Sequence, residues 1–279
     1  GHLGWNSISS FVSRSSSRIR PGDGVVGFIE GSFATVGRGK SSKFCTILEN
    51  LSFPAAAALP TIYCTAYYSS SHCARIKPGE TILIHSAAGG FGQAVIQLAK
   101  LYGAEIYVTV GKDEKRQFLF DTYNVPKDHM FSSRSDSFAK GVQRMTNNRG
   151  VDVVINSLVG EALRPSWECI APFGRFIEVG KKDVHNYVTL PMYQFAKNVT
   201  FICVDLVHLL EEQAELASAL LKDVMEMLRS GKISGPELLH IYNASQVEEA
   251  FRYMQSGKSG VIVSQRRRGT ELTAPFERR

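Results

Sequence analysis

The sequence lacks the markers of disulfide-bonded, metal-cluster and membrane-spanning proteins. Its five cysteines are scattered, odd in number and without a CxxC pair, which indicates ordinary thiols of a reducing, cytoplasmic environment. The seven histidines show no HxxxH or similar spacing, so no metal site is predicted. No apolar run approaches the roughly 20 residues that cross a bilayer, and no membrane partner is expected.

Charge of one sign is also scarce in the body of the chain. The net charge of +6 lies at the two ends: residues 1–20 carry three arginines and no acid, and residues 264–279 carry five arginines and two glutamates. The body between them is neutral, so no nucleic-acid partner is expected. Residues 7–18 have the Ser- and Arg-rich composition of a transit peptide, but a boundary inside a longer polypeptide is the preferred interpretation.

The most informative stretch is residues 82–100, where an apolar strand-like run turns through small residues into a helical pattern. The turn reads Ala87-x-Gly89-x-x-Gly92, the dinucleotide fingerprint with alanine in the first glycine position. Gly89 would let the backbone approach a pyrophosphate, and Gly92 would let the helix pack closely on the strand. A tight strand–helix turn without a ligand is the alternative. The predicted cofactor-binding residues of the turn are Ala87, Gly89, Gly90, Phe91 and Gly92.

The residues after the second predicted strand favour NADPH over NADH. In NAD-binding folds a carboxylate at this position binds the ribose hydroxyls, but here the position holds Gly111. Lys115 and Arg116 follow it, and Arg134 comes after the third strand. Such cations suit a 2′-phosphate. Taken alone, Lys115 and Arg116 are better explained as a solvated helix face, and the missing acid decides for NADPH.

Apolar segments alternate with helical patterns through the middle of the chain. The predicted strands are 81–85, 105–110, 129–132, 151–157, 174–179 and 199–204, and the predicted helices between them are 90–102, 113–122, 136–146 and 160–170. This alternation predicts an α/β fold, a doubly wound parallel Rossmann sheet with helices on both faces. The strand order expected is 3-2-1-4-5-6, with the ligand at the carboxyl edge.

The chain on either side of this sheet shows other patterns. Glycine-rich turns and β alternation, with strands expected at 25–29 and 33–36, indicate a small β domain in front. The elements expected behind the sheet are a long helix over 206–229, a strand at 240–242, a helix with a capping box of Ser245 and Glu248, and a strand at 261–263.

A set of segments carries a family resemblance: residues 20–23, 59–60, 65–68, 77–80, 108–111, 115–116, 151–158, 174–183 and 250–254. With them the chain resembles the enoyl reductase domain of fungal-type, highly reducing polyketide synthases, and more distantly that of animal fatty acid synthase. Both belong to the zinc-free branch of the medium-chain dehydrogenase/reductase superfamily. The match covers roughly residues 18–263, and Asn156-Ser157-Leu158 and the Gly-Arg-Phe-x-Glu-x-Gly-Lys-x-Asp segment are its most specific parts.

The resemblance implies a reaction, a cofactor and partners. In this family, NADPH delivers a hydride to the β-carbon of a trans-2-enoyl thioester, which is held on the phosphopantetheine arm of an acyl carrier protein. The protein orients the two reactants and stabilises the enolate-like charge. Other domains of a multifunctional synthase are expected as neighbours, and a homodimer is compatible with the family.

The resemblance also implies roles for individual residues. Thr65 falls where the family approaches the nicotinamide, and Asn156 and Ser157 close the fourth strand where the ribose and nicotinamide would pass. Lys181, with Asp183 beside it, is the first candidate for a charge-stabilising or proton-donating group. The alternatives are that Lys181 only forms a salt bridge with Asp183, and that Thr65 is a satisfied helix-start hydroxyl.

By the same resemblance, residues 1–53 form part of a truncated GroES-like β domain and 54–230 the NADPH-binding Rossmann domain. Residues 231–264 return to the β domain, and 265–279 form a disordered tail. Two other functions stay open: a free-standing quinone or small-enone reductase, and an NADPH-binding remnant without catalysis. His85, at the end of a strand, is expected to be a hydrogen-bonded core histidine rather than a catalyst.

Overall fold

The computed structural model describes residues 5–11, 19–32, 36–255 and 261–265. Three predictions fall wholly or largely outside these residues: the strand at 33–36, the segment at 7–18 with the composition of a transit peptide, and the tail at 265–279. Among the described residues, no helix is both long enough and apolar enough to cross a bilayer.

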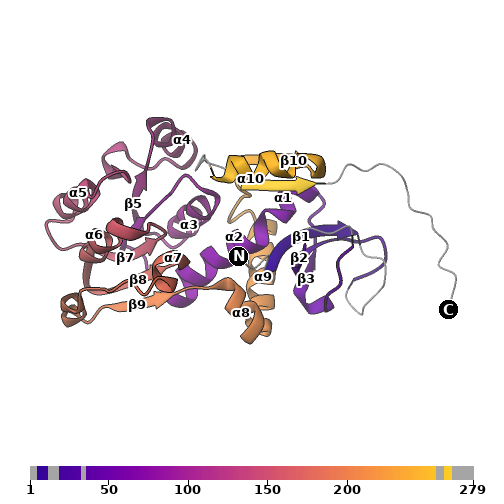
Figure 1. Cartoon of the computed structure of the whole chain (residues 1–279), viewed down its shortest axis with the longest axis horizontal. Coiled ribbons are helices and arrows are strands. Elements are labelled where there is room, and N and C mark those ends of the chain that lie inside the picture. The colour runs from indigo at the N-terminus through magenta and orange to yellow at the C-terminus, as the bar shows by residue number, and fades with distance from the viewer. Residues whose placement is uncertain (1–4, 12–18, 33–35, 256–260, 266–279) are drawn as a thin grey trace.

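A six-stranded parallel sheet forms the larger part of the molecule and lies at one end of it (Figure 1). Its strands are β4 (Thr81–Ile84), β5 (Glu105–Val110), β6 (Met130–Ser132), β7 (Val151–Asn156), β8 (Ile170–Glu178) and β9 (Thr200–Cys203). Their order is β6-β5-β4-β7-β8-β9, which confirms the predicted 3-2-1-4-5-6 arrangement. The chain crosses from one side of β4 to the other after β6, so the loops that follow β4 and β7 flank the switch point.

Both faces of this sheet are buried, which explains why its strands are nearly continuous apolar runs. In β4, Ile82 and Ile84 pack into one core cluster and Leu83 between them packs into the other. The first cluster includes residues of α3 (Gly90–Leu101), α4 (Asp113–Tyr123) and α9 (Ala214–Arg229). The second includes residues of α5 (Ser137–Met145) and α6 (Leu163–Glu168). Figure 1 shows these helices around the sheet.

A smaller β part lies at the other end of the molecule (Figure 1). Strands β1 (Trp5–Phe11), β2 (Gly24–Glu30) and β3 (Phe44–Thr46) form an antiparallel sheet in that order. Strands β10 (Leu239–Asn243) and β11 (Val261–Gln265) pair in parallel, and α10 (Val247–Gln255) connects them. The strands predicted at 25–29, 240–242 and 261–263 are therefore confirmed.

Helices over residues 53–73, to which the sequence pattern assigned no structure, join the two parts. They are α1 (Phe53–Ala57), α2 (Leu59–Tyr67) and a π-helical turn over Tyr68–Cys73. The Ser52 side chain caps α1 by accepting a hydrogen bond from the Ala55 N–H. Helix α2 contacts both α3 and β2, so it lies between the large and the small sheet.

The prediction of one long helix over 206–229 is wrong in one respect. This segment forms two helices, α8 (Leu206–Glu212) and α9. Gln213 separates them with a non-helical backbone conformation, φ −130° and ψ 50°. Its N–H donates to the Leu209 carbonyl, and its carbonyl accepts from the Ala217 N–H. One residue thus ends one helix and begins the next, so the apolar periodicity continues across the break.

The helix predicted over 160–170 is also wrong in its extent. A 3₁₀ turn over Gly160–Ala162 precedes α6, and Ile170 already pairs with Val151 as the start of β8. Strand β8 is correspondingly longer than the predicted 174–179. The capping box likewise lies elsewhere, with Asn243 and Gln246 in place of the predicted Ser245 and Glu248.

We predict that Gly92→Ala destabilises the fold by about 1–3 kcal/mol, the usual cost of overpacking. A Cβ at Gly92 would lie 2.5 Å from the Ala87 Cα and 2.6 Å from its carbonyl oxygen, both backbone atoms that cannot rotate away. Gly235→Ala is the control, because a Cβ there meets nothing within 4 Å. Urea unfolding of both variants measures the difference, and equal free energies of unfolding would contradict the close packing.

Candidate functional site

The glycine turn after β4 is positioned by the neighbouring strands. The His85 N–H donates to the Ile155 carbonyl of β7 (3.1 Å), and the Ala87 N–H donates to the Thr109 carbonyl of β5 (3.2 Å). Gly89 is the N-cap of α3 in an extended conformation, and a glycine offers no side chain to the first N–H groups of the helix. These N–H groups, with the positive end of the helix dipole, form an anion-binding position.

A buried amide that the sequence analysis did not single out supports this turn. Gln93 in α3 is fully buried, and its Nε2 donates to the Ala88 carbonyl at 3.1 Å. Its Oε1 accepts from the Tyr123 hydroxyl (2.9 Å) and from the Glu237 N–H (3.1 Å). The turn is therefore held by a buried amide whose nitrogen and oxygen are both hydrogen-bonded. The sequence signal for this role of Gln93 was a polar residue on the apolar, buried face of the α3 helix.

His85 is a core histidine, as predicted. It is fully buried, with Nδ1 2.9 Å from the Thr109 hydroxyl and Nε2 2.9 Å from the Ser166 hydroxyl. Its ring packs edge-on against Phe138. Burial lowers the pKa of His85 to about 3, so the ring is neutral and links strands to α6.

Three cations lie in the chain that follows β5 and β6: Lys112 comes directly after Gly111, Lys115 lies in the first turn of α4, and Arg134 follows β6. A Cβ at Gly111 would lie 3.4 Å from the Ser133 hydroxyl and 3.9 Å from Nε of Arg134. Burial lowers the pKa of Lys115, and the positive charges of Lys112 and Arg134 lower it further. The Lys115 ammonium is therefore close enough to both cations to be repelled by them. A position without a carboxylate and with three cations around it suits a bound phosphate.

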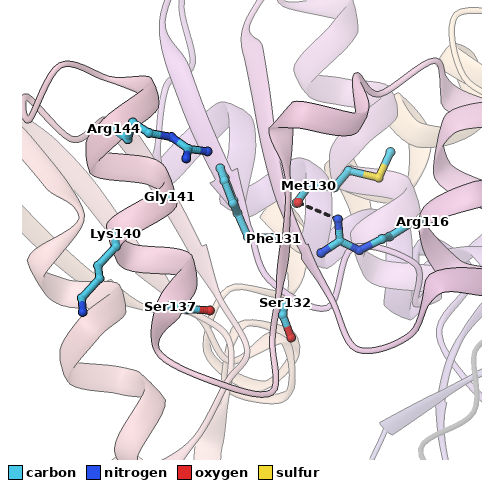
Figure 2. Close-up of a pocket in the computed structure, with 8 residues that line it drawn as sticks. All are labelled: Arg116, Met130, Phe131, Ser132, Ser137, Lys140, Gly141 and Arg144. Carbon is cyan, nitrogen blue, oxygen red and sulfur yellow. Dashed lines mark hydrogen bonds between the residues drawn. The ribbon is translucent and has the colours of Figure 1, made fainter.

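The Arg116 guanidinium contacts the strand next to its helix. Its Nη1 donates to the Met130 carbonyl at 2.8 Å, at the outer edge of β6, and its Nε is 3.6 Å from Asp113. Figure 2 shows the guanidinium reaching from α4 to this carbonyl, with Arg144 of α5 on the other side of Phe131. This contact places the Arg116 guanidinium at the edge of the sheet, and its predicted role in cofactor binding stays a prediction.

The carboxyl ends of β7 and β8 hold a buried polar pair. Asn156 ends β7, Glu178 ends β8, and the two residues are register partners. The Asn156 Nδ2 donates to Glu178 Oε2 at 2.5 Å, and the Gly180 N–H donates to Glu178 Oε1 at 2.6 Å. Burial raises the pKa of Glu178 to about 7; the two hydrogen bonds oppose this shift and the charge of Asp183 adds to it.

Three further predicted residues lie along this edge. The Ser157 hydroxyl is buried and has no hydrogen-bond partner within the described part of the chain. Asp183, in α7 (Lys181–His185), is only 5% exposed, and its Oδ2 accepts from the Gly160 N–H at 2.7 Å. Lys181 begins the same helix, and its Nζ lies 2.5 Å from Asp205 Oδ1.

Known proteins with similar sequences and structures show to which family the chain belongs. A family model described as "Zinc-binding dehydrogenase" matches residues 90–223. The chain is 45% identical over 271 residues to "Highly reducing polyketide synthase phiA" of a fungal species (strain ATCC 74256), a match that covers 96% of the chain and 10% of that synthase. It thus spans about a tenth of the length of such curated relatives.

Solved structures narrow the match to one domain. The crystal structure of CurK enoyl reductase superposes with a TM-score of 0.85 at 31% identity, covering 94% of this chain and 78% of that one. The chain belongs to the enoyl reductase domains of polyketide synthases. The nucleotide-binding subdomain of the enoylreductase domain of PpsC from Mycobacterium tuberculosis matches at 41% identity, with a TM-score of 0.59 over 63% of this chain and 96% of that one.

The donor set of this enoyl reductase domain does not fit the metal in the family model's description. Within the described ranges, no three His, Cys, Asp or Glu side chains gather closely enough to hold a metal ion. The four ligands of a structural zinc, or the three of a catalytic one, are therefore not assembled there.

The dinucleotide of the superfamily, by contrast, finds fitting residues in the enoyl reductase domain. The glycine turn leaves room for backbone approach, cations surround Gly111, and the Ser157 hydroxyl is buried without a partner. Of the predicted site residues, the structure brings Ser157, Asn156, Lys181 and Asp183 to one edge of the sheet.

The contacts bear on the alternatives given above for Lys181 and Thr65. Lys181 is paired with Asp205 rather than Asp183, because Asp183 is turned toward the Gly160 N–H. The Thr65 hydroxyl is satisfied, as that alternative expected, because it donates to the Thr61 carbonyl at 2.6 Å, but Thr65 lies inside α2 rather than at a helix start. Glu178 was part of the family segment, but no role was predicted for it.

The raised pKa of Glu178 predicts a pH-dependent stability for this enoyl reductase domain. The carboxyl titrates at 4.5 in the unfolded chain and at about 7 when folded, so the folded state binds its proton more tightly. The free energy of unfolding should therefore fall as pH rises between these values, by up to about 3 kcal/mol, and then level off. Urea unfolding of wild type and Glu178→Gln at intervals from about pH 5 to about pH 8 measures this, and a pH-independent difference between them would contradict it.

Proposed function

We propose that this chain is the NADPH-dependent enoyl reductase of a multidomain synthase, acting on a 2-enoyl thioester carried by an acyl carrier protein. One observation carries the proposal: the glycine turn, the cations near Gly111 and the unpartnered Ser157 hydroxyl lie along one carboxyl edge, at the switch point of the sheet. The relatives' names, which describe highly reducing polyketide synthases and enoyl reductases, supply the substrate class.

Particular residues would hold the cofactor. The first turn of α3 after Gly89 would receive the pyrophosphate, and Lys115 with Arg134 would receive the 2′-phosphate. Asn156 and Ser157 would border the ribose and nicotinamide. We further propose that residues 54–230 form the cofactor-binding domain, with 1–53 and 231–264 on the substrate side.

The chemistry divides between cofactor and protein. NADPH, when bound, supplies the hydride for the β-carbon of the enoyl group. The protein's part is to hold the thioester in place and to offer a cation or proton to the developing enolate. Lys181 is our candidate for that group, because its ammonium lies at the sheet edge and its side chain is 45% exposed. Its ion pair with Asp205 is worth only about 0–1 kcal/mol at such exposure, so Lys181 can exchange this partner for a substrate oxygen.

The test is the decay of NADPH absorbance with a trans-2-enoyl pantetheine thioester, beside NADH and quinone controls. Turnover of the thioester with NADPH supports the proposal. Turnover of quinones alone identifies a quinone reductase, and NADPH binding without any turnover identifies a cofactor-binding remnant.

We predict that Lys181→Met lowers kcat in this assay about 100-fold, the usual contribution of a positioned proton donor. The affinity for NADPH should stay unchanged, because the side chain is assigned to the substrate. Lys182→Met is the matched control, since this exposed neighbour has no such role. Equal kcat values for the two variants would remove Lys181 from the proposal.

A second prediction concerns the cofactor. Lys115→Ala should cost about 1–3 kcal/mol of NADPH binding, as expected for a charged hydrogen bond, and leave NADH binding nearly unchanged. Arg116→Ala should leave the ratio of the two dissociation constants unchanged, because its guanidinium is bonded to the Met130 carbonyl. Fluorescence titration measures both ratios. A loss from Lys115→Ala that is the same for both cofactors would contradict the 2′-phosphate assignment.

A further inference from the structure

The loop between β7 and the 3₁₀ turn at Gly160 is held at both ends by carboxylates from the next strand and helix. At its start, the Asn156 amide donates to Glu178. At its end, the Gly160 N–H donates to Asp183. Between these two points lie Ser157, Leu158 and Val159.

The start of the loop is held by more than one bond. Besides donating to Glu178, the Asn156 Nδ2 donates to the Leu158 carbonyl at 2.9 Å, and its Oδ1 accepts from the Leu158 N–H at 3.3 Å. The amide thus closes a small ring with the loop backbone, and Glu178 fixes the amide. A Cβ at Gly180 would lie 2.7 Å from Glu178 Oε1 and 3.8 Å from the Ser157 carbonyl oxygen, so glycine there lets carboxylate and loop approach.

The end of the loop depends on a single acceptor. Gly160 has a left-handed backbone, φ +68°, which turns its N–H toward Asp183 Oδ2 at 2.7 Å. Within the described residues no ion pair joins either carboxylate to a cation, and Lys181, in the same helix as Asp183, is paired with Asp205. Buried carboxylates without a cation are costly, so two of them bonded to one loop indicate that the position of the loop matters.

The loop carries a buried side-chain oxygen that lacks a hydrogen-bond partner in the described residues, the Ser157 hydroxyl. Buried hydroxyls are nearly always hydrogen-bonded in complete sites, so an orphan at the switch point indicates a ligand atom as its partner. We propose that Glu178 and Asp183 are positioning residues that clamp the 157–160 loop and thereby direct the Ser157 hydroxyl to a polar atom of the bound nicotinamide nucleotide. This assignment rests on the proposed function for the identity of the ligand.

Asp183 is thus assigned to positioning, whereas the family resemblance placed it beside Lys181 at the candidate proton donor. An asparagine at 183 keeps an oxygen that accepts from the Gly160 N–H but carries no titratable proton. Positioning therefore survives Asp183→Asn and fails in Asp183→Ala, whereas proton donation fails in both. For Glu178 the corresponding pair is Glu178→Gln, which keeps one of the two accepting oxygens, and Glu178→Ala, which keeps none.

The first measurement is hydrogen–deuterium exchange over the loop in the protein without added cofactor. Asp183→Ala should speed exchange of the Gly160 amide at least tenfold, and Asp183→Asn should leave it near the wild-type rate. Unchanged exchange in Asp183→Ala overturns the clamp whether or not the chain is a reductase. This readout does not use activity, so a failed clamp is distinguished from a failed function.

The second measurement is NADPH affinity by fluorescence titration, with thermal unfolding as a check on folding. Asp183→Ala and Ser157→Ala should each weaken binding about tenfold, and the double variant should be no weaker than Ser157→Ala alone. Additive losses would show that Asp183 acts elsewhere and would overturn the proposal. A loss of kcat in Asp183→Asn of 100-fold or more, at unchanged affinity, would return Asp183 to proton donation.

Discussion

The approach of α3 to β4 is the constraint on which the rest of the site depends. At Gly92 the helix lies so close to the preceding turn that a Cβ would come within 2.5 Å of the Ala87 Cα. This contact points the N-terminal end of α3 across the carboxyl edge of the sheet, and the buried Gln93 amide fixes the turn beneath it. The anion-binding position at the helix end is therefore a product of backbone packing rather than of charged side chains.

On the other side of the switch point, side-chain hydrogen bonds rather than backbone packing hold the structure in place. Strands β7 and β8 end in the Asn156–Glu178 pair, and Asp183 holds the following loop at Gly160. These groups are buried at a real cost in desolvation, which their hydrogen bonds offset only in part, as the raised pKa of Glu178 indicates. The His85 N–H donates to the Ile155 carbonyl and so connects the glycine turn after β4 with the end of β7. The glycine turn and the 157–160 loop are therefore held by the same pair of strands.

The sheet, its strand order and the glycine turn could be predicted because apolar runs and a glycine spacing are local signals. The break at Gln213 could not, because one residue caps two helices without interrupting the apolar stripe. The contacts of the candidate site residues could not be predicted, because they join residues that are far apart in the sequence. Lys181 and Asp183 lie where the family segment placed them, yet their partners, Asp205 and Gly160, are distant in sequence. Glu178 gave no signal of its own, since only the pairing of β7 with β8 brings it to Asn156.

The most direct test of this account is a crystal structure of the chain with NADPH. The account predicts the pyrophosphate at the first turn of α3, the 2′-phosphate between Lys115 and Arg134, and the Ser157 hydroxyl within hydrogen-bond distance of the nucleotide. A 2′-phosphate bound instead by Arg116 and Arg144, which lie on the two sides of Phe131, or a nucleotide that leaves the Ser157 hydroxyl without a partner, would contradict it.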